Sequence, residues 1–227
     1  MSDYLTVIGF GSLMSEQDAR RSCPNLTNFR PISVLGYTRI FNKIDGNLKA
    51  TDLDRLSQSR MIANWGMFER EGCKVLGAAF EVPGGEYPAL VKREREYRLE
   101  KAHFKNTDGT FEHGIACCGF RNNAAFLKHL EAEPMQRAFY MERAKPNPAS
   151  VVWTDNILPY NRYLAFVLTA ARNLSDAHLI NLLEESFLAD GKTTVGSYLA
   201  PRLQDLDHIK ELEWLGDYFE DKKIKSA

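Results

Sequence analysis

The chain has 227 residues, of which 44% are hydrophobic and 26% charged, and its formal net charge is −1. This composition is typical of a soluble globular protein, and we expect one domain over residues 1–227. The balanced charge offers no basic surface to nucleic acid or to an anionic membrane, and neither an apolar span nor a secretion signal is present. We therefore expect a cytoplasmic protein that binds neither nucleic acid nor membrane. The oligomeric state is left open.

Glycines bracket a turn that follows the first predicted strand. Gly9 and Gly11 allow the backbone to leave the strand and to approach a ligand closely. Ser15 and Asp18 then predict the N-cap of a short helix over 15–23. Peptide N–H groups at such a turn can hold a carboxylate or an oxyanion. We expect this loop to bind substrate, with a ligand-free turn as the alternative, and its predicted residues are Ile8, Gly9, Phe10, Gly11, Ser12 and Leu13.

The spacing of this loop excludes two nucleotide motifs. A dinucleotide fingerprint needs a third glycine where the chain has Met14. A phosphate loop needs a Gly-Lys-Ser or Gly-Lys-Thr ending, and none follows. We do not expect phosphate chemistry at this loop.

Six segments have the composition of β-strands: 5–8, 32–42, 61–68, 75–82, 97–104 and 111–120. The third and fourth are separated by 69–73, a gap of hairpin size, and 106–109 is a good turn sequence between the last two. The segment 43–59 is polar and turn-prone, and a short helix is predicted over 86–95. This pattern predicts an α+β fold, a small mixed or antiparallel β-barrel of about six strands with flanking helices.

A helical period replaces the strand pattern from Ala124 onward. A short helix is predicted first, and 160–173 forms a better one. Ser175 predicts the cap of a further helix that ends near Gly191. The residues assigned to the three apolar faces are Phe126, Leu127 and Leu130; Tyr163, Phe166, Val167 and Ala170; and Leu179, Leu182, Leu183 and Phe187.

Two further regions complete the predicted organisation. The segment 131–150 is polar and contains three prolines, so we expect an excursion there, and 121–158 is a possible lid or insertion in the domain. The C-terminal part is predicted to be helical. Its last forty residues form short surface helices, with Trp214 and Tyr218 packing back on the body.

Histidine and cysteine are poor candidates for the chemistry. The five histidines stand singly, without the spacing of metal ligands, and we expect no metal site. The four cysteines are expected to be free thiols. A nucleophile at Cys117 or Cys118 with His113 is an alternative, but the run IACCGF is typical of a packed strand.

Two carboxylates are better candidates. Glu94 and Glu96 lie at a predicted helix end that leads into the strand near Tyr97. If one of them faces inward at the mouth of a barrel, it can move protons near neutral pH. The alternative is a solvated charge run, in which these glutamates pair with Arg93 and Arg95 on the surface.

The order of these motifs resembles the gamma-glutamylcyclotransferase-like family. The loop Phe10–Leu13, FGSL, is similar to the family's Y-G-S-L or Y-G-S-N loop, and Arg93, Glu94 and Tyr97 match its R-E-x-x-Y setting. The segments GYTRIFN at 36–42 and VLGAAFEVP at 75–83 resemble two family strands. SFLADGKTTVGSYL at 186–199 is similar to the tail of the ChaC-like, glutathione-degrading branch. The chain departs from the family at Phe10, where the loop tyrosine is absent, and at 121–158, which has no counterpart.

The resemblance implies an enzyme that cyclises a small-molecule gamma-glutamyl amide to 5-oxoproline and releases an amine. It implies that Glu94 is the catalytic base and that Tyr163, after the proline of LPYNRYL, contacts the substrate; a core aromatic is the alternative for Tyr163. It implies neither a metal nor an organic cofactor. A barrel that binds a small molecule or a partner without turning it over is the alternative function, because a fold does not determine a function.

Overall fold

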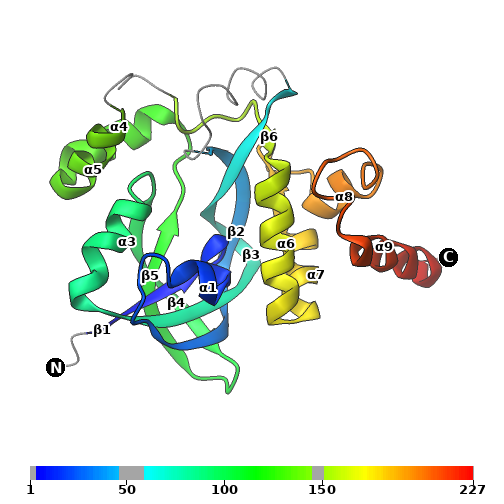
Figure 1. Ribbon diagram of the computed structural model, residues 1–227, viewed down its shortest axis with the longest axis horizontal. Coiled ribbons are helices and arrows are strands. Elements are labelled where there is room, and N and C mark those ends of the chain that lie inside the picture. The colour runs from blue at the N-terminus through cyan, green and yellow to red at the C-terminus, as the bar shows by residue number, and fades with distance from the viewer. Residues whose placement is uncertain (1–3, 46–58, 145–150, 227) are drawn as a thin grey trace.

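The computed structural model describes residues 4–45, 59–144 and 151–226, and at its centre is a closed β-barrel (Figure 1). Five strands form the ring, each paired with the next and the last paired with the first: β1 (Tyr4–Gly9), β5 (Phe111–Cys118), β4 (Arg98–Asn106), β2 (Thr27–Ile44) and β3 (Met61–Pro83). The β1–β5 pair is parallel and the other ring pairs are antiparallel. Two short strands, β6 (Leu158–Pro159) and β7 (Ser186–Leu188), extend the sheet beside β3 and β2. The expected α+β barrel with flanking helices is confirmed.

The predicted hairpin between 61–68 and 75–82 is wrong, because both segments belong to the single strand β3. Both halves of β3 pair with β2, and the ladder passes from Leu35 opposite Lys74 to Tyr37 opposite Glu69. Residues 70–73 therefore bulge out of the ladder instead of reversing the chain. Gly36 and Gly72, both at φ +77°, allow the two strands to separate locally there.

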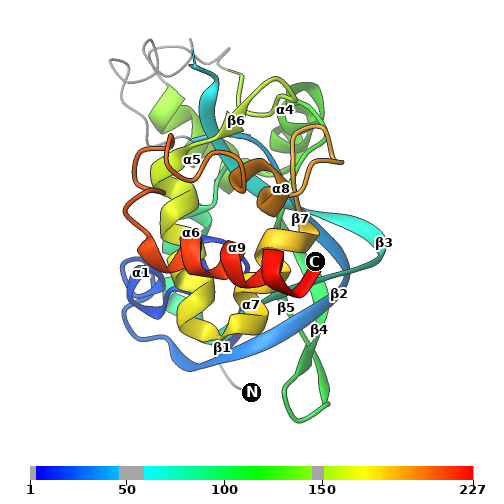
Figure 2. The ribbon, with the colours of Figure 1, turned by 90° about the vertical axis from the view of Figure 1, so that its right-hand side faces the viewer.

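Helices cover the barrel on several sides (Figures 1 and 2). Beside β3 lie α6 (Asn161–Leu174) and α7 (Asp176–Glu185), which also pack on each other. The apolar face of α6 is confirmed for Val167 and Ala170, but Phe166 is 38% exposed and does not belong to it. The predicted end of the following helix near Gly191 is wrong: α7 ends at Glu185, and Phe187 lies in β7, which pairs with β2.

The segment 121–158 is more regular than the sequence pattern predicts. It contains α4 (Asn123–Ala132) and α5 (Pro134–Ala144), and Pro134 is tolerated because it stands at the first position of its helix. Trp153 is fully buried and bridges to Lys43 on β2, so this part of the segment belongs to the core. That 121–158 acts as a lid stays a prediction, and its residues 145–150, like 46–58 in the turn-prone segment, lie outside the described residues.

The C-terminal region contains α8 (Val195–Leu199) and α9 (Glu213–Ser226), which crosses in front of α6 and α7 in Figure 2. Trp214 and Tyr218 on α9 are half-buried and pack against the main core, as the sequence predicts. At fourteen residues α9 is longer than the short helices expected there. None of the helices that the structure describes combines the length and the apolar composition needed to cross a membrane.

Candidate active site

The loop after β1 is folded so tightly that it requires glycine. A Cβ at Gly9 would collide with the backbone carbonyl of Leu13. A Cβ at Gly11 would lie 2.6 Å from Trp65 Nε1 and 2.7 Å from Tyr163 Oη, well inside van der Waals contact. The chain then makes a 3-10 turn, η1 (Ser12–Met14), and enters α1 (Glu16–Ala19). The predicted N-cap is confirmed, because the Ser15 hydroxyl accepts a hydrogen bond from the Asp18 N–H at 3.3 Å.

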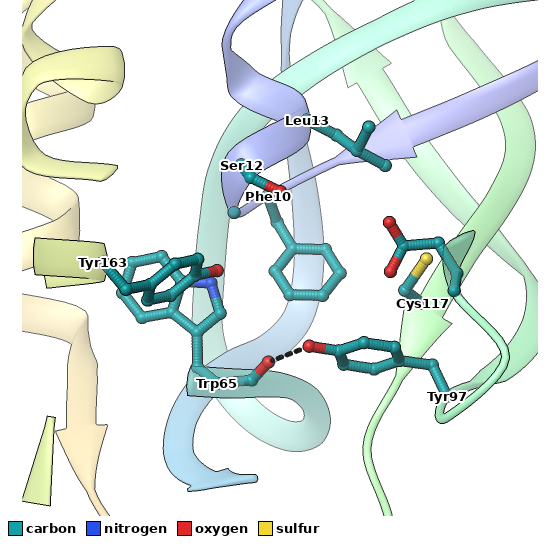
Figure 3. A pocket seen from close by; sticks show the side chains of 9 residues that line it. Phe10, Ser12, Leu13, Trp65, Tyr97, Cys117 and Tyr163 are labelled. Carbon is teal, nitrogen blue, oxygen red and sulfur yellow. Dashed lines mark hydrogen bonds between the residues drawn. The ribbon is translucent and has the colours of Figure 1, made fainter. Parts of the chain in front are cut away.

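A cavity of about 260 Å³, partly open to solvent, lies between this loop and the barrel mouth (Figure 3). Its walls come from the loop, from β3, from the end of α3 (Tyr87–Arg93), from β5 and from α6. The lining residues are Phe10, Gly11, Ser12, Leu13, Trp65, Glu94, Tyr97, Cys117 and Tyr163. Segments far apart in the sequence therefore meet at one hollow.

The structure places six of the eight predicted site residues around this cavity. Glu94, Tyr163 and the four loop residues 10–13 line it, whereas Ile8 and Gly9 do not. Ile8 is fully buried in the core, and Gly9 packs closely on Gly77 of β3, so these two residues support the loop from behind. The prediction that they contact substrate is not supported by their position.

Glu94 is a buried carboxylate held from two sides. It follows α3 directly, its N–H donates to the Leu90 carbonyl at 2.9 Å, and it is 8% exposed. Arg93 Nε donates to Glu94 Oε1 at 2.9 Å. The thiol of Cys117 lies beside the carboxylate, and burial together with the charge of Glu94 raises the pKa of this thiol. Because two different elements hold it, the Glu94 side chain has a fixed orientation at the cavity wall.

Arg93 connects this carboxylate to the loop. Its guanidinium contacts Asp18 Oδ2 at 2.5 Å and donates to Ser12 Oγ at 2.9 Å, in addition to its bond with Glu94. Burial lowers the pKa of Arg93, but the attraction of Glu94 and Asp18 raises it by more, so that the net pKa is above its usual value. Arg93 therefore stays charged and fixes the loop relative to the carboxylate.

Glu96 has the same exposure as Glu94, 8%, but a different neighbourhood. Its Oε2 lies 2.7 Å from Lys43 Nζ in a buried ion pair. Its backbone carbonyl accepts a hydrogen bond from Trp153 Nε1 at 3.1 Å. Glu96 is absent from the cavity lining. The charge run is therefore not a solvated surface: its two glutamates are buried in different places.

Two tyrosines present neutral hydroxyl groups at the cavity. Burial raises the pKa of Tyr97 and of Tyr163 well above the usual value, and for Tyr163 the charge of Glu94 adds to the effect. Tyr97 Oη donates to the Trp65 carbonyl at 3.0 Å, as drawn in Figure 3. The backbone N–H of Ser12 lies near the Tyr163 hydroxyl and offsets part of the increase in its pKa. Tyr163 thus lies against the loop that the sequence predicts as the binding site.

The pattern of the sequence missed Trp65, which lines the cavity, and Arg39, which lies fully buried beneath the loop. Cys117 also lines the cavity, and the sequence suggests it only as an alternative nucleophile. Arg39 Nε donates to the Phe10 carbonyl at 2.9 Å, and its other nitrogens bind Asn181 and Leu76. The sequence marks Trp65 and Arg39 only as residues of predicted strands. No sequence pattern distinguishes a fully buried arginine from an exposed one.

The raised pKa of Cys117 argues against a cysteine nucleophile. Burial and the charge of Glu94 raise it well above its usual value, so the thiol stays protonated. His113, the proposed partner, is exposed on β5 and its ring lies beside His103 instead. Over the described ranges, no group of three or more His, Cys, Asp or Glu side chains is placed to hold a metal ion.

No family model and no curated protein match this chain. Among solved structures, it is similar to an uncharacterized human protein, with 10% identity and a TM-score of 0.44 over 61% of this chain and 87% of that one. It is similar to a gamma-glutamyl cyclotransferase, with 10% identity and a TM-score of 0.43 over 60% and 86%. A glutathione-specific gamma-glutamyl cyclotransferase from yeast gives 12% identity and a TM-score of 0.39 over 77% and 98%. Likenesses this distant assign no activity.

Proposed function

We propose that this protein is a gamma-glutamylcyclotransferase-type enzyme that converts a gamma-glutamyl amide to 5-oxoproline and a free amine. The observation that carries the proposal is the position of Glu94, a buried carboxylate that lines the same small cavity as the Phe10–Leu13 loop and the Tyr163 hydroxyl.

The reaction needs a proton carrier rather than a protein nucleophile. Glu94 accepts a proton from the substrate α-ammonium group, and the freed amine attacks the γ-carbonyl carbon to close a five-membered ring. Glu94 passes this proton to the leaving nitrogen as the tetrahedral intermediate collapses and the amide C–N bond breaks. The ring nitrogen gives up its second proton to Glu94, which transfers it to the departing amine, so that the amine leaves as an ammonium ion. Holding amine and carbonyl together supplies much of the rate advantage, because the attack is intramolecular.

The surrounding residues suit these steps. Arg93 and Cys117 orient the Glu94 carboxylate from two sides. Loop peptides and the Tyr163 hydroxyl are donors for the substrate carboxylate or the oxyanion. Glu94, the loop and Tyr163 belong to three separate elements, so a small displacement of one relative to the others would lower the reaction rate. The contacts of Arg93 with Glu94 and Ser12 limit such displacements.

The substrate is proposed to be a gamma-glutamyl compound of the glutathione type, because residues 186–199 resemble the ChaC-like branch. These residues form β7, the following turn and the whole of α8, and none of them lines the cavity. We therefore expect residues at the cavity rim or beyond it to select the leaving group. Comparing the turnover of several gamma-glutamyl substrates identifies which leaving group is accepted.

The decisive test is the mass of the product. The protein is incubated with glutathione, a gamma-glutamyl amino acid and a gamma-glutamyl alkylamine, and 5-oxoproline is the expected primary product. An N-acylated gamma-glutamyl amide is expected to be inert, because acylation removes the nucleophilicity of the attacking nitrogen. Glutamate as the primary product, or turnover of the blocked amide, would show hydrolysis and remove the proposed mechanism.

One observation favours a binding protein instead. Phe10 stands where the family has tyrosine, and its ring lies between Tyr163 and Tyr97 in Figure 3, so no hydroxyl is present at this point of the wall. A non-catalytic barrel would bind the same gamma-glutamyl compounds with a measurable heat of binding and release no 5-oxoproline from any of them.

A further inference from the structure

The indole N–H of Trp65 is a hydrogen-bond donor without an acceptor. Trp65 is fully buried, and its Nε1 has no hydrogen-bond partner among the residues that the structure describes, although Trp65 lines the candidate cavity. A buried donor left unsatisfied destabilises the fold, which is why such groups are rare and call for an explanation. Trp153 gives the contrast, because its equally buried indole donates to the Glu96 carbonyl at 3.1 Å.

A second donor lies close to this one. Trp65 Nε1 and Tyr163 Oη both pack against Gly11: they lie 2.6 Å and 2.7 Å from the point where a Cβ on Gly11 would stand, so the two atoms are at most 5.3 Å apart. Burial raises the pKa of Tyr163 well above its usual value, so its hydroxyl carries a proton that it can donate. One oxygen in the cavity beside Gly11 can therefore lie within hydrogen-bond distance of both donors.

The charge next to these two donors is positive. The Arg39 guanidinium lies 5.4 Å from the centre of the Trp65 ring. Burial lowers the pKa of Arg39 to about 9, so it is still charged near neutral pH. A cation behind the indole favours an oxygen that carries negative charge in front of it.

We propose that Trp65 Nε1 and Tyr163 Oη together donate to one ligand oxygen in the cavity beside Gly11, which makes Trp65 a substrate-binding residue. The ligand oxygen belongs to a carboxylate or to a carbonyl that becomes an oxyanion; both are acceptors of the same chemistry. The identity of the ligand as a gamma-glutamyl compound rests on the proposed function, but the two-donor site itself rests on Trp65, Tyr163 and Gly11.

The first experiment observes the donor directly. The chain has three tryptophans and so three indole N–H signals in a ¹⁵N-correlated NMR spectrum. Addition of 5-oxoproline is expected to move the Trp65 signal downfield, while those of Trp153 and Trp214 stay in place. 2-Pyrrolidinone has only the ring carbonyl and proline only the carboxylate, so the compound that reproduces the shift identifies the oxygen. A stationary Trp65 signal at saturating 5-oxoproline, with binding shown by calorimetry, would overturn the proposal.

The second experiment removes the donor and keeps the shape. Replacing Trp65 with 3-benzothienylalanine exchanges the N–H for sulfur, and kcat/KM is expected to fall about tenfold or more with the melting temperature unchanged or raised. A fall in kcat at constant KM indicates an oxyanion contact, and a rise in KM indicates a carboxylate contact. Trp214→Phe, on α9 away from the cavity, is the control. Unchanged kcat/KM in the Trp65 variant would contradict the proposal.

The two proposals fail separately. If no gamma-glutamyl amide yields 5-oxoproline but the Trp65 signal still moves on binding, the oxygen site stands and the cyclisation is wrong. If 5-oxoproline forms and the Trp65 signal and kcat/KM are both unaffected, the cyclisation stands and the oxygen site is wrong.

Discussion

Glu94 and Glu96 are two residues apart and equally buried, but their carboxylates have different surroundings. The carboxylate of Glu96 is neutralised by the ammonium group of Lys43 in a closed part of the core. The carboxylate of Glu94 is held by Arg93 and Cys117 at the wall of a cavity. Burial alone therefore does not identify a reactive group; a buried carboxylate becomes a candidate base when its free side faces a space that a substrate can enter.

The largest expected effect is on stability, from Glu96→Gln. Removing one member of a buried ion pair leaves Lys43 charged and uncompensated, which costs about 3–5 kcal/mol in the free energy of unfolding. Turnover per folded molecule is expected to be near normal. The measurement is urea unfolding, and Glu96→Gln combined with Lys43→Met is expected to recover part of the loss. If Glu96→Gln abolishes turnover in a stable protein, the two glutamates have been assigned the wrong way round.

The largest expected effect on turnover comes from Glu94→Gln. The amide keeps the size of the side chain but cannot carry the proton, so 5-oxoproline formation is expected to fall about a hundredfold or more. Binding of 5-oxoproline by calorimetry should be retained. Glu100→Gln on β4 is the matched control, since that side chain is 42% exposed and pairs with Arg98 at the surface. Equal rates in the Glu94 variant and in the wild type would refute the base assignment.

A smaller effect is expected from Tyr163→Phe. The ring packs edge-on against Trp65 with 5.9 Å between centroids, and this packing survives the change. Loss of the hydroxyl is expected to lower kcat/KM about tenfold, with a small shift in melting temperature. The opposite pattern, a large melting shift with unchanged kcat/KM, would make Tyr163 a core residue only.

The smallest expected effect is that of Cys117→Ala. The thiol orients Glu94 but is protonated and forms no bond to the substrate, so turnover should change by about threefold or less, with about 1 kcal/mol lost for the small void. A cysteine nucleophile would instead be inactivated by this change. Chelating agents are likewise expected to leave the rate unchanged, and loss of activity on chelation would indicate a metal-dependent reaction.

The barrel was predictable from the sequence because its strands carry a clear β composition and its turns carry glycine. The single strand β3 was not, because Glu69–Cys73 has the length and polarity of a hairpin turn, and only pairing with β2 shows that the chain bulges there. Phe187 was assigned to a helix for a similar reason: its apolar spacing suits a helix, while its strand partner on β2 is far away in the sequence.

The sequence predicts those parts of the candidate site that belong to a recognisable motif. The FGSL loop and the R-E-x-x-Y match point to residues that the structure brings to one cavity. Trp65 and Arg39 have no such mark, because their importance comes from a missing partner and from complete burial, which are properties of three-dimensional packing. The sequence indicated that one of the two glutamates could face inward, but not that both are buried or that Lys43 neutralises the other.

The parallel pairing of β1 with β5 joins Val7 to Ile115 and Ile8 to Ala116, two parts of the chain that are distant in sequence. Such a contact forms late in folding, because the entropy of closing a long loop must be overcome before the pairing stabilises anything. The FGSL loop directly follows the paired end of β1, and Cys117 directly follows the paired residues of β5. We therefore expect slow refolding, in which the recovery of ligand binding coincides with closure of the barrel and lags behind the formation of the local β4–β5 hairpin.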